Sequence, residues 1–260
     1  MAVPRRAQMR NWLDELAEKT AKAARKALRS KAPERVVQTG ASGSPTSALD
    51  RIAERVIIDE LDDAPIPLNL CSEEIGNLDR GADWWLVADP VDGTRNALHG
   101  VPFHAVSLAL GRKDLAGIEL GVVHSIPTPG SYWGEKGRGA TFDGKRLDVK
   151  RGSHLEPLVG TALDYERGLR LPEGHKLHFR DLGSAALEMC LVAAGALDAF
   201  YCDQKLLRVV DVAASTLIVR EAGGHVFDLS KKPLNAPFDV RSKFPMVALR
   251  EANLWEALRP

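Results

Sequence analysis

The sequence predicts a layered α/β (α+β) fold in which helices cover two sheets. Helical periodicity dominates residues 8–30 and 46–61, and strand patterns then follow one another closely before strands begin to alternate with helices. Consecutive strands favour an antiparallel meander, whereas strand–helix alternation favours a second sheet packed against helices. We therefore expect an N-terminal α+β lobe over residues 1–152 and a C-terminal α/β lobe over residues 153–260, working as a single functional unit.

The first predicted helix is amphipathic. Apolar residues recur at helical spacing from Met9 to Leu28, and charged residues of both signs lie between them. This pattern is typical of a helix that packs on a core. A helix lying on a membrane surface is the alternative, but its polar face would carry fewer acidic residues.

The remaining elements are predicted from short apolar runs and the turn residues that bound them. Asp143-Gly144 predicts a hairpin turn. Predicted strands in the N-terminal lobe cover residues 84–88, 104–110, 118–124, 131–135 and 140–148. In the C-terminal lobe, strands are predicted at 158–163, near 178–182, and at 199–202, 225–227 and 246–249, and helices at 185–194, 211–222 and 252–258.

Composition excludes several classes of partner. Lys plus Arg and Asp plus Glu are equal at 35 each, so no net charge attracts the protein to nucleic acid or membrane. No stretch approaches the roughly 18–20 apolar residues that span a bilayer, and the N-terminus lacks the apolar region of a secretory signal. Cys71, Cys190 and Cys202 lack metal-ligand spacing, which favours reduced, buried thiols in a cytoplasmic protein.

The most informative segment is 86–96, Leu-Val-Ala-Asp-Pro-Val-Asp-Gly-Thr-Arg-Asn. A short buried strand is expected to end at Asp89-Pro90, because proline cannot donate to a sheet. Asp89 and Asp92 then lie close together on a tight turn, where their repulsion is relieved by a cation. Oxygen ligands of this kind suit Mg²⁺ or Mn²⁺. The backbone amides after Asp92 begin a helix and can bind an anion, so the segment suggests phosphate chemistry.

Other acidic residues strengthen this interpretation. Glu73-Glu74 ends an apolar segment, and Asp211 and Asp50 each stand at the start of a predicted helix. Each aspartate alone is equally well explained as a helix cap.

Taken together, these segments resemble the inositol monophosphatase-like family of Mg²⁺-dependent phosphatases. Asp-Pro-Val-Asp-Gly-Thr-Arg-Asn is similar to its central signature, Ser-Glu-Glu to its upstream acidic element, and Val-Asp-Val-Ala-Ala to its C-terminal signature. The Gly-Ser-Pro-Thr loop at residues 43–46 and Leu207-Arg208 ahead of Asp211 most resemble the archaeal-type inositol monophosphatase/fructose-1,6-bisphosphatase branch. The resemblance implies a five-layer α-β-α-β-α sandwich of the sugar phosphatase type, usually a homodimer.

The resemblance also implies roles for particular residues. Metal binding falls to Glu73, Asp89, the Val91 carbonyl, Asp92 and Asp211, and orientation of the attacking water to the catalytic pair Asp50 and Thr94. The implied substrate contacts are the amides of Gly93 and Thr94, the segment Gly183, Ser184 and Ala185, and the polar side chains Asp203, Lys205 and Arg208.

The predicted function is therefore a Mg²⁺-dependent phosphomonoesterase acting on a small phosphate ester, inositol monophosphate or fructose 1,6-bisphosphate. Two metal ions about 4 Å apart would activate water for in-line attack. Two alternatives stay open: a 3′-phosphoadenosine 5′-phosphate phosphatase, which shares the metal motifs, and a family member that acts as a protein-binding regulatory module.

Overall fold

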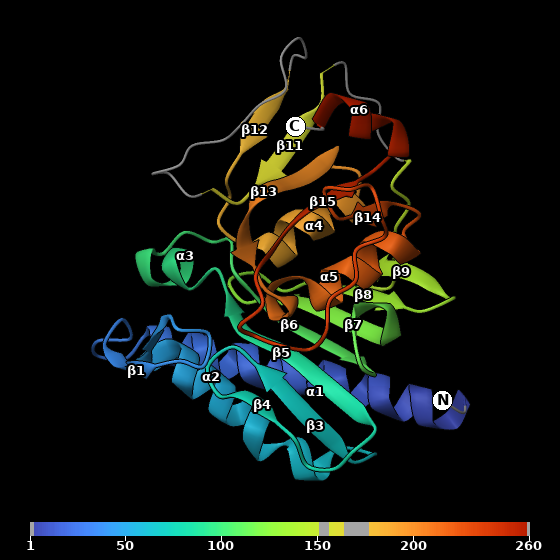
Figure 1. The fold of residues 1–260 in the computed structure, drawn as a ribbon. Helices are drawn as coiled ribbons and strands as arrows, with labels where there is room; N and C mark the ends of the chain where they lie inside the picture. The colour runs from blue at the N-terminus through green and yellow to red at the C-terminus, as the bar shows by residue number, and fades with distance from the viewer. Residues whose placement is uncertain (1–2, 151–155, 164–176, 259–260) are drawn as a thin grey trace.

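The computed structural model describes residues 3–150, 156–163 and 177–258, and these form five layers (Figure 1). Two helices cover one face of a large sheet, two more helices lie between that sheet and a smaller one, and a short helix lies beyond the small sheet. This arrangement confirms the predicted sandwich. The predicted lobe boundary between residues 152 and 153 falls outside the described residues.

The outer helical layer consists of α1 (Val3–Leu28) and α2 (Ala48–Asp59). Apolar side chains of α1, among them Leu13 and Leu16, are buried against the large sheet and α2, as the amphipathic pattern predicts. A hairpin of β1 (Val36–Thr39) and β2 (Pro45–Ser47) leads into α2. No helix in the described ranges is both long and apolar enough to cross a bilayer.

The large sheet has eight strands among the described residues, in the order β10-β9-β8-β7-β6-β5-β3-β4. Neighbouring strands are antiparallel except β3 and β5, which are parallel. The predicted Asp143-Gly144 hairpin joins β9 to β10. The strands are β3 (Leu68–Ser72), β4 (Gly76–Leu78), β5 (Trp84–Asp92), β6 (Ala105–Gly111), β7 (Ile118–Ser125), β8 (Ser131–Glu135), β9 (Gly139–Phe142) and β10 (Lys145–Arg146), with short 3₁₀ turns η1 (Leu61–Asp63) and η2 (Leu115–Gly117) in the connections.

The prediction that the central strand ends at Asp89-Pro90 is wrong. β5 continues to Asp92, and its pairing with β6 shifts register between Asp89 and Asp92. Such an irregularity accommodates a proline, which cannot donate a ladder hydrogen bond. α3 (Thr94–His99) follows directly.

The middle layer consists of α4 (Ala185–Ala193) and α5 (Val209–Glu221), and α5 lies directly on the large sheet. Two sheet glycines permit this approach. A Cβ built on Gly121 would lie 3.0 Å from the Ala214 Cα, and one built on Gly134 would lie 3.0 Å from the Ile218 nitrogen. Glycine is therefore required at both positions by the closeness of the helix backbone.

The smaller sheet has five strands in the described part of the chain, in the order β12-β11-β13-β15-β14. Two predicted boundaries need correction here. β13 continues past Cys202, because after a bulge it pairs again with β15 at Leu207, and the last predicted helix divides into a 3₁₀ turn and one α-helical turn. The elements are β11 (Leu158–Thr161), β12 (His178–Arg180), β13 (Ala199–Leu207), β14 (His225–Phe227), β15 (Phe244–Leu249), η3 (Ala252–Leu254) and α6 (Trp255–Leu258).

The three cysteines are free and buried, as predicted. Burial raises the pKa of the Cys71 thiol to about 12 and that of Cys202 to about 11. Both thiols are therefore protonated and unreactive at neutral pH.

Substituting Gly134→Ala should destabilise the protein by about 1–3 kcal/mol, because the added methyl group must push α5 away from β8. Gly121→Ala tests the same contact on the neighbouring strand. Urea unfolding of each variant measures the change. Wild-type stability in both variants would show that the close packing of α5 is dispensable.

Candidate metal centre

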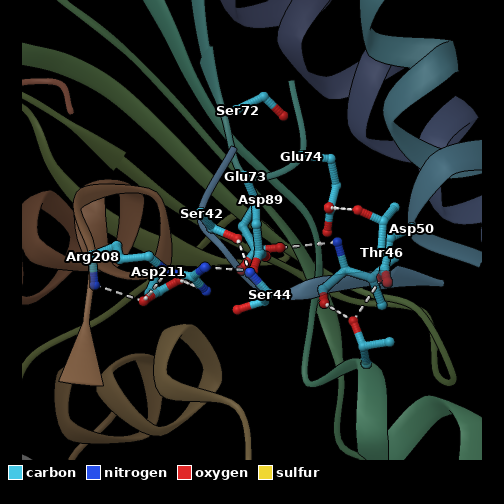
Figure 2. Close-up of polar contacts among 12 residues, drawn as sticks. Ser42, Ser44, Thr46, Asp50, Ser72, Glu73, Glu74, Asp89, Arg208 and Asp211 are labelled. Atoms are coloured by element: carbon cyan, nitrogen blue, oxygen red, sulfur yellow. Dashed lines mark hydrogen bonds and ion pairs between the residues drawn. The ribbon is translucent and has the colours of Figure 1, made fainter. Parts of the chain in front are cut away.

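Three acidic side chains from distant parts of the chain converge at one point. Glu73 follows β3, Asp89 lies on β5, and Asp211 lies in the first turn of α5. One carboxylate oxygen from each lies within 4.8 Å of the others. Figure 2 shows Glu73 and Asp89 side by side, with Asp211 facing them from α5. The structure thus brings together three of the predicted metal ligands.

The other two predicted ligands lie on the irregular end of β5. The Val91 amide donates to Asp89 Oδ1 over 3.1 Å, which folds the strand end around the carboxylate. Asp92 Oδ2 accepts hydrogen bonds from the Ser184 hydroxyl and, over 2.8 Å, from the Ala186 amide. Asp92 is therefore held by the start of α4 through this one oxygen.

Asp211 is the third residue of α5 and not its N-cap, and it caps the helix from that position by accepting from the N-cap amide. The N-cap is Arg208, whose amide donates to Asp211 Oδ2 over 2.7 Å. The Arg208 guanidinium also lies 3.1 Å from Asp211 Oδ1 and 2.6 Å from Glu73 Oε1. The predicted substrate-binding arginine is thus paired with two predicted metal ligands.

The Glu73-Glu74 segment is held from two sides. Glu54 of α2 accepts hydrogen bonds from the Ser72 hydroxyl and from the amides of Glu74 and Ile75, at 2.6, 3.2 and 3.0 Å. On the other side, Glu74 accepts from the Thr46 hydroxyl (Figure 2). Glu73 therefore projects from a backbone that is fixed by neighbouring carboxylates.

The loop between β1 and β2 lies over this segment. The Ala41 amide donates to the Glu74 carbonyl over 2.8 Å, and the Ser42 amide to the Glu73 carbonyl over 3.3 Å. A Cβ built on Gly40 would meet Glu74 Oε2, so a larger residue there would displace the Glu74 carboxylate. The loop is thus anchored to the backbone that carries a metal ligand.

The predicted catalytic pair is in contact. The Thr94 hydroxyl lies 2.7 Å from Asp50 Oδ1 and 2.9 Å from the Val91 carbonyl. Asp50 is the third residue of α2, and its Oδ2 accepts from the Ser47 amide and hydroxyl in a capping box. The helix cap and the proposed catalytic role therefore use different oxygens of one carboxylate, so both interpretations of Asp50 hold geometrically.

The segment after Asp92 packs tightly against the segment before α4. Gly93 has a φ of 87°, and a Cβ there would lie 3.0 Å from the Gly183 carbonyl. Glycine is required by both the dihedral angle and the space. The Asn96 amide donates to the carbonyls of Phe103 and Leu182, over 2.8 and 2.7 Å. The predicted phosphate-binding and substrate-contacting segments are therefore neighbours.

Burial and mutual repulsion dominate the electrostatics of the acidic group. Burial raises the pKa values of Glu73 and Asp92 to about 7 each, the neighbouring Asp211 adding to both. The pKa of Asp89 lies well above its ordinary value, first because of burial and then because of Glu73 and Asp92. Charged carboxylates are thus costly here without further positive charge.

This donor set fits a divalent cation. All the converging groups are oxygens, which magnesium and manganese prefer, and the described histidines and cysteines contribute none of the clustered ligand atoms. The cation would supply the positive charge that the buried carboxylates lack.

The two remaining predicted substrate residues lie on β13. Asp203 and Lys205 both fall within the bulge between Cys202 and Leu207. Lys205 is exposed, whereas Asp203 Oδ1 is buried and has no hydrogen-bond partner in the described chain. A buried acceptor without a partner is consistent with a ligand contact.

Comparison with known proteins gives the family. The family model "Inositol monophosphatase family" matches residues 8–258. The chain belongs to the inositol monophosphatase family. This confirms the resemblance inferred from the motifs. The family is metal-dependent, and the acidic group of this chain is of a kind that can bind a metal ion.

Individual relatives of this family member point to its archaeal-type branch. The chain is 32% identical over 240 residues to the fructose-1,6-bisphosphatase/inositol-1-monophosphatase of Methanothermobacter thermautotrophicus, covering 86% of this chain and 85% of the relative. It is 35% identical over 241 residues to a bifunctional NADP phosphatase/NAD kinase of Methanococcus maripaludis, covering 83% of this chain but only 42% of that longer protein. A solved protein of Pyrococcus horikoshii, titled as hypothetical with similarities for inositol-1 monophosphatase, matches with a TM-score of 0.81 and 28% identity over 95% of each chain.

One residue of this chain that positions the site could not be assigned a role from the motifs. Glu188 of α4 is buried, and its carboxylate oxygens accept from the Thr161 amide over 3.1 Å and the Leu182 amide over 3.2 Å. Together with Asn96 it holds the Leu182 peptide from both sides. A lone glutamate within the apolar helix 185–193 is the signal that could have revealed it.

Glu188 should make stability depend on pH. Burial, with Asp181 nearby, raises its pKa from 4.5 to about 9. Between these values the unfolded chain holds fewer protons than the folded one, so the free energy of unfolding falls as pH rises. Glu188→Gln should remove this contribution, so that the variant gains stability relative to the wild type between about pH 5 and pH 9.

Chemical unfolding across this range, with EDTA present, measures the difference. Glu221→Gln is the matched control, because Glu221 also accepts from two backbone amides, those of Gly137 and Gly139, but does so at the β8–β9 turn. A constant stability difference between Glu188→Gln and wild type across the pH range would contradict the prediction.

Proposed function

We propose that this member of the inositol monophosphatase family is a Mg²⁺-dependent phosphomonoesterase that hydrolyses inositol monophosphate, fructose 1,6-bisphosphate or both. The observation that carries the proposal is the convergence of Glu73, Asp89 and Asp211 beside the Thr94–Asp50 contact. Relatives named fructose-1,6-bisphosphatase/inositol-1-monophosphatase support the substrate class. Phosphate release by the purified protein with Mg²⁺ is the direct test.

Each group has a proposed task in the hydrolysis. Glu73, Asp89, the Val91 carbonyl, Asp92 and Asp211 would hold the divalent cations. When bound, the cations acidify water, neutralise the phosphate and stabilise the leaving oxygen.

The protein's own groups would place the reactants. Thr94, held by Asp50, orients the attacking water through its hydroxyl group, and the amides of Gly93 and Thr94 bind phosphate oxygens where α3 begins. The neighbouring Gly183–Ala185 segment would face the sugar or inositol ring. The contact between Gly93 and Gly183 supports this placement, because it brings the two segments together.

A nucleotide phosphatase is the second candidate. The relative named bifunctional NADP phosphatase/NAD kinase is 35% identical to this chain, although the chain covers only 42% of it. This favours NADP as a test substrate beside 3′-phosphoadenosine 5′-phosphate. We also propose a homodimer, as the family resemblance implies, and sedimentation of the purified protein tests this assembly. The reduced, buried cysteines support a cytoplasmic location. A protein-binding regulatory role would be favoured over catalysis if no phosphate ester were hydrolysed.

Asp89→Asn should lower phosphatase activity by orders of magnitude, because a proposed metal ligand loses its charge. The same change should raise the stability of the metal-free protein, since it removes a buried charge repelled by Glu73 and Asp92. Phosphate release with Mg²⁺ and thermal unfolding in EDTA measure the two effects. The exposed Asp79→Asn is the control, and substantial activity in Asp89→Asn would contradict the two-metal mechanism.

Thr94→Ala should lower kcat by roughly 10²-fold and leave KM nearly unchanged, because orientation of the water matters mainly in the transition state. Steady-state kinetics at saturating Mg²⁺ separates the two constants. The exposed Thr128→Ala serves as the control. A defect confined to KM would instead assign Thr94 to substrate binding.

Lys205→Ala should raise KM for fructose 1,6-bisphosphate more than for inositol 1-phosphate, because only the bisphosphate has a distal phosphate to lose a charge-assisted contact. Lys205 is exposed, whereas Arg208 is already paired with Glu73 and Asp211. Kinetics with both esters measures the ratio, and the exposed Lys243→Ala is the control. Equal effects on both substrates would assign Lys205 no role at a distal phosphate.

A further inference from the structure

Arg208 places a positive charge among the proposed metal ligands. Its guanidinium lies 2.6 Å from Glu73 Oε1, and it contacts both oxygens of Asp211, at 3.1 Å and 3.3 Å (Figure 2). Only 13% of its side chain is exposed. Two charge-assisted contacts in a site of low exposure make this a strong interaction.

The local backbone fixes this arrangement. Arg208 is the N-cap of α5 and Asp211 is its third residue, so the arginine and the proposed metal ligand share one helical turn. From there the guanidinium reaches across to Glu73, which directly follows β3 of the large sheet. Arg208 therefore joins the two parts of the chain that must meet to form the site.

The contacts have two opposite consequences for a divalent cation. Arg208 offsets the repulsion between Glu73 and Asp211, which keeps these ligands together before a cation arrives. It also occupies the same carboxylates and places positive charge where a second positive charge must enter, which disfavours cation binding.

We propose that Arg208 is an internal counter-cation that stabilises the metal-free site and competes with the divalent cation for Glu73 and Asp211, so that it sets the metal affinity of the enzyme. The inference rests on the proposed metal site and goes beyond it, since it concerns a residue that is not a ligand. Arg208 should therefore raise the stability of the metal-free protein and lower its affinity for the divalent cation.

The test uses Arg208→Gln, which keeps hydrogen-bonding groups but removes the charge. Calorimetric titration with Mg²⁺ should show binding about tenfold tighter than wild type, the change expected for the loss of one charge-assisted contact. Thermal unfolding in EDTA should show a lower Tm than wild type, so the rise in Tm caused by Mg²⁺ should be larger in the variant. Neither readout depends on activity.

Arg250→Gln is the matched control. Arg250 forms a buried ion pair with Asp198 at 2.9 Å, with 9% of the arginine side chain and 2% of the aspartate exposed, in the small sheet. Its replacement should lower Tm in EDTA without changing the Mg²⁺ affinity. Arg208→Lys keeps the charge but cannot bridge two carboxylates through one planar group, so it should bind Mg²⁺ more tightly by a smaller factor.

Unchanged or weaker Mg²⁺ binding in Arg208→Gln would overturn the inference and show that Arg208 only orients the ligands. If that variant does not fold, Arg208→Lys decides the question by the same titration. A wild-type protein that binds neither Mg²⁺ nor Mn²⁺ would instead overturn the proposed metal site itself, so the two failures are distinguishable.

Discussion

The repulsion among buried carboxylates is the constraint on which the rest of this structure depends. Glu73, Asp89, Asp92 and Asp211 come from two strands or their ends and from one helix, and the fold brings them together where little water reaches them. Without a cation, burial and mutual repulsion favour the protonated form of these carboxyl groups, as the raised pKa values of Glu73, Asp89 and Asp92 show. The site is therefore assembled against an electrostatic cost, and a cation is the natural means of offsetting it.

Neighbouring groups help the fold tolerate this cost, because they hold either a candidate ligand itself or the backbone that carries it. Glu54 holds the segment that carries Glu73, and the start of α4 holds Asp92 through Ser184 and Ala186. Glu188 in turn holds the segment before α4. Metal ligands gain affinity and orientation from such surrounding hydrogen bonds. The middle helical layer thus packs on the large sheet and also positions the site, because α5 lies close enough to the sheet to place Asp211 beside Glu73 and Asp89.

The sequence revealed the candidate ligands because they lie in short, locally determined segments. Asp89, Asp92 and Thr94 fall within one strand end and turn, where spacing alone restricts their geometry. Two sheets layered with helices were also predictable from the order of strand and helix patterns, and the family resemblance supplied the order of the five layers. Prediction failed where tertiary pairing overrides local preference. β5 continues through Pro90 because β6 pairs on both sides of the irregularity, and β13 continues past Cys202 because β15 lies beside it.

What the sequence by itself determined is the family and the acidic character of the site, because these depend on residue types at fixed spacing, and the five-layer fold followed from the family resemblance. Only the tertiary structure decided which side chains form hydrogen bonds and ion pairs with one another. Asp50 divides its two oxygens between a helix cap and Thr94, and Arg208 turns its guanidinium to Glu73 and Asp211. Such pairings join residues far apart in the chain, and their energies depend on distance and burial, which a linear pattern does not contain.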